Sequence, residues 1–227
     1  MLMEGDLICE DYQKLSSRMR GTCMSYSDFT LESVERLLGV SAHPGDLFPK
    51  LVAVPAPVWL SELLTRGTQG MQLSLISEKA RSEFIVAPIL LASRELSGNR
   101  FAIYSGQRLD VDPENGLTGE CDFILTAADA MLPLQAPIAT IVEAKKNDVE
   151  GGLGQCIAQM VAADRFNQQS GRRGAPIFGC VTTGEAWQFA RLAGSEVLLE
   201  RRRFYIDHTE IILGVFSAII NECRAQL

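Results

Sequence analysis

The sequence predicts an α/β fold, in which a central mixed β-sheet is flanked by helices. Three apolar runs of strand length lie in the middle of the chain, each bounded by turn-forming residues. A segment with helical spacing follows them, and then a second group of strands and a closing helix. Strands that alternate with helical segments in this order are typical of a sheet covered by helices on both faces.

The composition is that of a folded globular domain. The chain has 227 residues, of which 47% are hydrophobic and 22% charged, so it can bury a sizeable core and is not expected to be disordered. No apolar run is long enough to span a bilayer, and the acidic first residues do not predict a signal peptide. The six cysteines lack metal-binding spacing, which favours buried reduced thiols and a cytoplasmic location.

Two parts are expected along the chain. Residues 1–70 predict a small, mostly helical and irregular N-terminal elaboration, and residues 71–227 predict the core with its C-terminal helix. A helix at 31–38 is expected to be capped by Thr30 and ended by Gly39. The other expected elements are a short strand at 51–54, helices at 59–67 and 71–98, strands at 101–105, 121–126 and 138–144, a helix at 151–171, strands at 176–184, 186–192 and 196–206, and a helix at 208–227. Pro88 is expected to kink the helix at 71–98.

Charged side chains interrupt two of these strands. Because side chains alternate along a strand, Asp122 points away from Phe123, while Glu143 and Lys145 share one face. A short connection favours neighbouring strands, in which Asp122, Glu143 and Lys145 would converge. Two carboxylates that lie close together repel each other and favour a cation between them, and hard oxygen ligands suit Mg²⁺. Each feature taken alone is also typical of a solvated strand edge.

The helices before and after these strands add three polar candidates. Glu83 lies on an apolar stripe between Ala80 and Ala87, so it is expected to face the core and to need a lysine, a hydrogen-bond network or a metal. Gln155 and Gln159 lie one turn apart and can reach the site as supporting hydrogen-bonding groups. The alternatives are an ordinary buried ion pair for Glu83 and exposed glutamines on the later helix.

This set of residues resembles the PD-(D/E)xK nuclease superfamily, which has the restriction-endonuclease-like fold. The matching segments are SEKARSEFIVAPIL, GECDFIL, IVEAKK and GQCIAQMVAA. The later FGCVTTGEAWQF is similar to a strand pair of type I restriction-enzyme nuclease domains. The resemblance covers residues 71–206. Cys121 stands where the family name has proline, and Gln159 stands where one branch of the superfamily has tyrosine.

The resemblance implies a metal-dependent endonuclease, a phosphodiester hydrolase that uses Mg²⁺, which Mn²⁺ can replace. The catalytic set would be Glu83, Asp122, Glu143, Lys145, Gln155 and Gln159. The metal would be held by Asp122, Glu143, the carbonyl of Ala144 and, directly or through water, Glu83. Lys145 would orient or activate the attacking water and stabilise the charge that develops on the phosphate.

Other functions stay open. The net charge of -7 and the lack of a DNA-reading module count against a nuclease that finds its target alone. A homodimer or a partner subunit that supplies specificity is therefore considered, with nucleic acid, DNA before RNA, as the expected ligand and no membrane. The alternative is a nucleic-acid-binding or assembly module that keeps the nuclease fold without cleaving, and an unrelated α/β domain is the third hypothesis.

Overall fold

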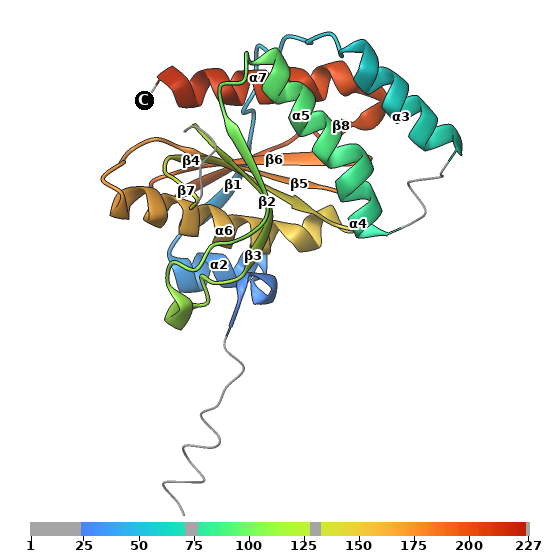
Figure 1. Ribbon diagram of the computed structural model, residues 1–227. Coiled ribbons are helices and arrows are strands. Elements are labelled where there is room, and N and C mark those ends of the chain that lie inside the picture. Colours follow the sequence, from blue (N-terminus) through green and yellow to red (C-terminus); the bar gives the residue numbers. More distant parts are fainter. Residues whose placement is uncertain (1–23, 71–76, 128–132, 226–227) are drawn as a thin grey trace, which may run out of the picture.

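The computed structural model describes residues 24–70, 77–127 and 133–225 (Figure 1). In these ranges the chain forms an open, mixed, eight-stranded sheet flanked by helices, which confirms the predicted α/β class. The strands are β1 Ser41–Gly45, β2 Ala102–Arg108, β3 Glu120–Thr126, β4 Ile138–Ala144, β5 Ile177–Thr182, β6 Ala186–Ala193, β7 Glu196–Glu200 and β8 Phe204–Tyr205. The α-helices are α2 Leu31–Leu38, α3 Val58–Gly70, α4 Glu78–Arg81, α5 Ala87–Leu96, α6 Val149–Gln169 and α7 Thr209–Ala225. The π-helix η3 covers Ser82–Val86, and short 3₁₀ turns cover Tyr26–Asp28 (η1), Pro113–Asn115 (η4) and Ile206–His208 (η5).

The strand order places the predicted strands of the site side by side. The order is β1-β7-β6-β5-β4-β3-β2, and β8 pairs with β6. The β3 and β4 strands are antiparallel neighbours, as their short connection predicts. The β4 and β5 strands are parallel and are joined through α6, because parallel neighbours need a crossover connection. The start of β3, the end of β4 and the end of β5 therefore lie at the same end of these interior strands.

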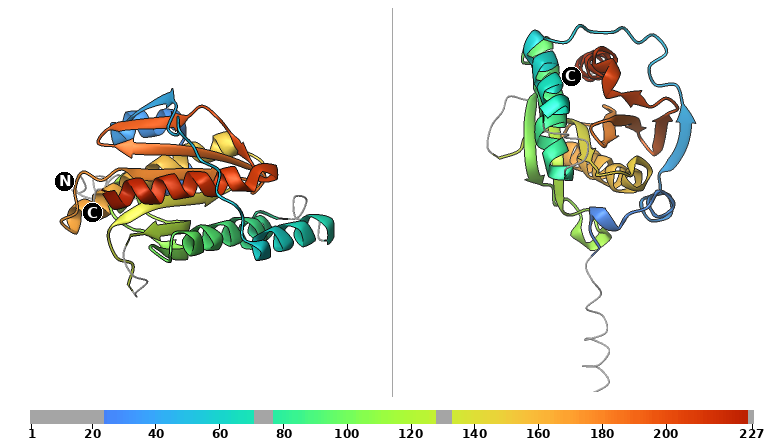
Figure 2. Two further views of the ribbon diagram at one scale, coloured as in Figure 1. Left: turned by 90° about the horizontal axis from the view of Figure 1, so that it is seen from above. Right: turned by 90° about the vertical axis from the view of Figure 1, so that its right-hand side faces the viewer.

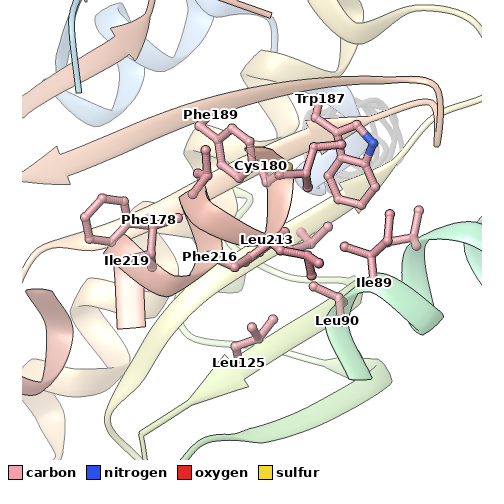
Figure 3. Close-up of a cluster of buried hydrophobic side chains, with 14 of the residues drawn as sticks. Ile89, Leu90, Leu125, Phe178, Cys180, Trp187, Phe189, Leu213, Phe216 and Ile219 are labelled. Atoms are coloured by element: carbon pink, nitrogen blue, oxygen red, sulfur yellow. The ribbon is translucent and has the colours of Figure 1, made fainter. Parts of the chain in front are cut away.

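Two hydrophobic layers fill the space between the sheet and its helices. Helices α3, α5 and α7 cover one face, and α6 with α2 covers the other, as the views in Figures 1 and 2 show. On the first face Phe189 contacts Phe216 of α7 edge to face, with 5.5 Å between ring centroids. Figure 3 shows these rings with Trp187 and with Ile89 and Leu90 of α5 in one buried cluster. Among the helices that the structure describes, none combines the length and the apolar character needed to cross a bilayer.

The segment before β1 packs closely against α6. Helix α2 begins after its N-cap residue Thr30 and ends at Gly39, whose φ of 68° is left-handed, so both predicted caps are confirmed. A Cβ at Gly154 of α6 would lie 2.4 Å from the carbonyl oxygen of Phe29. The absent side chain at this position therefore allows the chain that enters α2 to cross α6 at close range.

The N-terminal part of the chain also contributes a strand that the sequence does not predict. Ser41–Gly45 forms β1, which pairs in parallel with β7 and occupies one edge of the sheet. Pro44 is tolerated there because an edge strand has one side without ladder hydrogen bonds. The strand predicted at 51–54 is wrong, because these residues have no regular secondary structure.

The long helix predicted at 71–98 is interrupted by a π-helical turn. Its first residues, 71–76, lie outside the described ranges. In η3 the Ala87 N–H donates to the Ser82 carbonyl, five residues back, before α5 continues with α-helical bonding. Pro88 follows directly after this turn, inside a helical segment that continues from η3 into α5, and it donates no backbone hydrogen bond there. The departure from α-helical geometry therefore comes one turn before the kink that Pro88 predicts.

Candidate active site

Asp122 lines an open cleft of about 320 Å³ at the end of the sheet where β3 begins and β4 ends. One wall comes from α4 and η3, and the other comes from β2, β3 and the end of β4. The residues that line it are Glu78, Lys79, Ser82, Glu83, Ser105, Gly106, Glu120, Asp122 and Ala144. Four carboxylates and one ammonium therefore face this space, which makes the cleft acidic.

Asp122 lies at the point where β3 and β4 stop pairing through their main chains. The backbone ladder between the two strands reaches Phe123 and Val142. Beyond that pair, Oδ2 of Asp122 accepts a hydrogen bond of 2.7 Å from the backbone N–H of Ala144. A side-chain carboxylate thus replaces the main-chain partner of Ala144, and this bond fixes Asp122 next to the Glu143–Lys145 segment.

Glu143 is the centre of a buried hydrogen-bond network. Its side chain is 4% exposed, and its Oε1 accepts hydrogen bonds from Nζ of Lys145 (2.8 Å) and Nε2 of Gln155 (2.6 Å). Its Oε2 accepts a bond of 2.9 Å from Nε2 of Gln159. Lys145 also donates to Oε1 of Gln155 at 2.7 Å. The structure therefore brings together these four predicted residues, two from the end of β4 and two from one face of α6.

A glycine at the start of α6 makes room for the lysine of this network. A Cβ at Gly152 would lie 3.0 Å from Cγ of Lys145 and 2.6 Å from Cγ1 of Val181. The helix predicted at 151–171 begins with this glycine-rich stretch, and no role at the site was predicted for Gly152. Its position a few residues after the Glu-x-Lys segment was the available signal that helix and lysine pack together. Glu78 and Glu120, which line the cleft, were also missed, because nothing in their local spacing separates them from surface carboxylates.

Glu83 is not on the core-facing side of its helix, so that prediction is wrong. Its side chain is 53% exposed and lies 3.9 Å from Nζ of Lys79. The π turn explains the difference, because it winds more residues into one turn and three-and-four spacing no longer identifies a common face across it. Glu83 still lines the cleft that Asp122 lines. Within the described ranges, however, no group of three or more His, Cys, Asp or Glu side chains is arranged to hold a metal ion.

The pKa values of both acids, the buried Glu143 and the partly buried Asp122, are raised. For Glu143, burial comes first and the charge of Asp122 second, and together they raise the pKa to about 7 against the opposing effect of Lys145 and Gln159. For Asp122, burial is again the largest cause, and the Ala144 N–H and Lys145 oppose it. Two carboxylates that resist ionisation in this way are stabilised in their charged form by a nearby cation.

Asp122 and Glu143 offer part of the ligand set that a hard divalent cation requires. Asp122 and Glu143 supply carboxylate oxygens, the ligand type that Mg²⁺ prefers. Oδ2 of Asp122 is already bonded to Ala144, and its Oδ1 has no hydrogen-bond donor among the described residues. The buried Oε1 of Gln159, beside Glu143, likewise lacks a partner within the described part of the chain. The metal ligands predicted from the sequence, Asp122, Glu143 and the Ala144 carbonyl, stay a prediction. Glu83, the fourth predicted ligand, lies across the cleft from Asp122.

The raised pKa of Glu143 predicts how stability depends on pH in the metal-free protein. The pKa rises from an ordinary 4.5 to about 7 on folding, so the neutral form is favoured in the folded state. The corresponding stability is fully present below about pH 4.5 and is lost as the pH rises through about 7. We expect Glu143→Gln to reduce the fall in Tm between about pH 5 and about pH 8 by several degrees, measured by thermal unfolding in the presence of a chelator.

The matched control for this measurement is Glu185→Gln, at an exposed position in the turn before β6. It should leave the pH dependence of Tm as it is in the wild-type protein. An unchanged pH dependence in Glu143→Gln would show that Glu143 is ionised at neutral pH without a cation.

Comparison of the sequence with models of known protein families and with curated proteins finds no match. A function for this protein is therefore inferred from the chemistry of the site and from the order of its elements. That site holds a buried acid, a partly buried acid, an ammonium and two amides beside an open cleft.

Proposed function

We propose that this protein is a Mg²⁺-dependent nuclease of the PD-(D/E)xK type, which hydrolyses phosphodiester bonds in nucleic acid, with DNA as the expected substrate. The observation that supports this most is the placement of Asp122 beside the Glu143–Lys145 segment at the diverging ends of two paired strands. Asp122 and the Glu143–Lys145 pair come from separate strands, and the protein buries the Glu143 carboxylate at a cost that a purely structural strand end would not require.

The arrangement of elements also supports the proposal. Helices α4, η3 and α5 precede an antiparallel meander of β2, β3 and β4, and α6 then leads to β5, which is parallel to β4. A restriction-endonuclease-like core has the same order of helix, three strands, helix and strand. We propose that fold for residues 77–193, with β1 and β7 extending the sheet.

Each residue of the site has a proposed role. Asp122, Glu143 and the Ala144 carbonyl would hold Mg²⁺ or Mn²⁺, and Glu83 would contact metal-bound water from the opposite wall. When bound, the cation polarises the scissile phosphate and makes water a better nucleophile near neutral pH. Lys145, whose Nζ donates to Oε1 of Glu143, would orient the attacking water and offset charge on the phosphate.

The two glutamines would fix the orientation of Glu143. Gln155 donates to one carboxylate oxygen and Gln159 to the other. Both donors come from one face of α6, so the carboxylate plane is set by a rigid element. Hydrogen bonds of this kind determine how well a ligand is presented to a metal.

Sequence specificity is proposed to come from a second copy or from a partner subunit. The cleft carries four carboxylates, and the described elements form one α/β unit around it without a separate DNA-reading module. Such a surface repels phosphates until a cation offsets its charge. We therefore expect nucleic acid to bind the isolated protein weakly and only with divalent cation present.

The test is cleavage of supercoiled plasmid, linear duplex, single-stranded DNA and RNA with Mg²⁺ or Mn²⁺, and with a chelator. Nicking or cutting that depends on the cation and is absent in Asp122→Asn, purified in parallel, would support the proposal and exclude a contaminating nuclease. Binding of nucleic acid without cleavage of any substrate would favour the non-cleaving module instead.

A further inference from the structure

A buried arginine connects one wall of the cleft to the strand end that carries Lys145. Arg81 is the last residue of α4 and is 7% exposed. Its Nη1 donates a hydrogen bond to the carbonyl of Lys146, the residue directly after Lys145. The same nitrogen lies 3.3 Å from the carbonyl oxygen of Thr183, in the turn between β5 and β6. One guanidinium group therefore bonds to two main-chain segments, the residue after Lys145 and the turn that follows β5.

The turn that Arg81 contacts also holds Lys145 directly. The backbone N–H of Lys145 donates to the carbonyl of Thr182 at 2.7 Å. Oγ1 of Thr182 in turn donates to the carbonyl of Ala186 (2.9 Å) and accepts from the N–H of Gly184 (2.9 Å). This turn is thus fixed by its own hydrogen bonds. A displacement of the Lys145–Lys146 segment would break bonds to both the turn and Arg81.

The helix itself changes geometry at this position. The π turn η3 begins at Ser82, immediately after Arg81, and π turns within helices are frequent at functional sites. Ser82 and Glu83 line the cleft, while Ile85 is buried and packs on Gly184, where a Cβ would lie 3.2 Å from its Cδ1. The β5–β6 turn is therefore contacted by two residues of this helical segment. Arg81, just before η3, bonds to Thr183, and Ile85, within η3, packs on Gly184.

We infer that Arg81 is a positioning residue for the proposed reaction, and this inference rests on the proposed function. Arg81 sets the position of the Lys145 main chain, and hence of its ammonium group and of the Ala144 carbonyl, relative to the α4 wall of the cleft. An arginine suits this task because its side chain is longer than that of lysine and its planar group holds Nη1, which contacts both carbonyls, in a fixed orientation. A site in which reacting groups are misplaced by about 1 Å loses on the order of 10²-fold in rate.

Arg94 provides a matched control. It lies on α5 and bonds in a similar way, with Nε donating to the carbonyl of Phe101 at 2.8 Å and Nη1 donating to Oδ1 of Asn99 at 2.6 Å. Neither partner is adjacent to Lys145 or to Thr182, the residue that accepts the Lys145 N–H, whereas Lys146 and Thr183 are. A comparison of Arg81 with Arg94 thus separates a general loss of stability from a loss of geometry at the site.

The experiment compares Arg81→Lys and Arg81→Met with Arg94→Lys and Arg94→Met. All four variants are expected to unfold a few degrees below the wild-type protein. Only the Arg81 variants should lower kcat, by about 10- to 100-fold with little change in KM, and accelerate amide hydrogen exchange at Lys145. Equal losses of kcat in the Arg81→Met and Arg94→Met variants, or unchanged exchange at Lys145 in Arg81→Met, would overturn the inference.

Hydrogen exchange also separates this inference from the proposed function. If the wild-type protein cleaves no substrate but Arg81→Met accelerates exchange at Lys145, the nuclease proposal fails and the positioning of the segment by Arg81 stands. If Arg81→Met does not fold, Arg81→Lys supplies the same comparison, because it keeps the charge but its side chain is one bond shorter and does not reach the place where Nη1 contacts both carbonyls.

Discussion

Replacing Asp122 by asparagine is expected to lower kcat for nucleic-acid cleavage by about 10³-fold and to abolish tight Mn²⁺ binding while leaving the fold intact. The amide oxygen of asparagine can still accept the Ala144 N–H that now bonds to Oδ2, so the strands keep their positions. What is lost is one of the two negative charges on which cation binding depends, and electrostatic contributions of this kind are usually the largest in catalysis. Calorimetric titration with Mn²⁺ and a plasmid-cleavage assay measure the two effects.

The same substitution has a second expected signature, in the neighbouring acid. The charge of Asp122 is the second largest cause of the raised pKa of Glu143, so Asp122→Asn should lower that pKa. The fall in Tm with rising pH should accordingly be smaller and should end at a lower pH than in the metal-free wild-type protein. Glu120→Gln is the matched control, because it removes a carboxylate of the same strand and cleft without touching the proposed ligands. Undiminished Mn²⁺ affinity in Asp122→Asn would rule out the proposed metal set.

Replacing Lys145 by methionine should separate cleavage from metal binding. We expect kcat to fall by about 10²- to 10³-fold, because the ammonium beside the phosphate is lost, while Mn²⁺ still binds. Lys145 lowers the pKa of Glu143, so that pKa should rise further in the variant and Mn²⁺ should bind well only at higher pH. The loss of a charged hydrogen bond to a buried carboxylate should cost about 1–3 kcal/mol in the free energy of unfolding.

Lys146→Met is the control for this variant, since its side chain is exposed and its main-chain bond to Arg81 does not depend on the side chain. It should keep kcat within a few-fold of wild type. Cleavage by Lys145→Met at the wild-type rate would remove Lys145 from the proposed mechanism. Loss of Mn²⁺ binding at every pH would instead assign it a role in holding Glu143.

The sequence by itself determined those features that depend on neighbours along the chain. Helix α2 followed from Thr30 and Gly39, because both caps act within one turn of the helix. The strands β3 and β4 followed from their apolar runs, and the common face of Glu143 and Lys145 followed from strand alternation. The spacing of Gln155 and Gln159 likewise sufficed to place both amides on one face of α6, where they bond to Glu143.

Only the tertiary structure decided the features that depend on distant partners. β1 is a strand because β7, far along the chain, pairs with it, and its own residues with Pro44 do not favour that conformation. The outward position of Glu83 follows from the π turn, which helical periodicity does not reveal. Arg81 appears as a surface charge in the sequence, yet folding buries it against two carbonyl groups from separate segments. Local pattern determines an element and its faces, whereas a buried charge acquires its partner only when separate elements pack together.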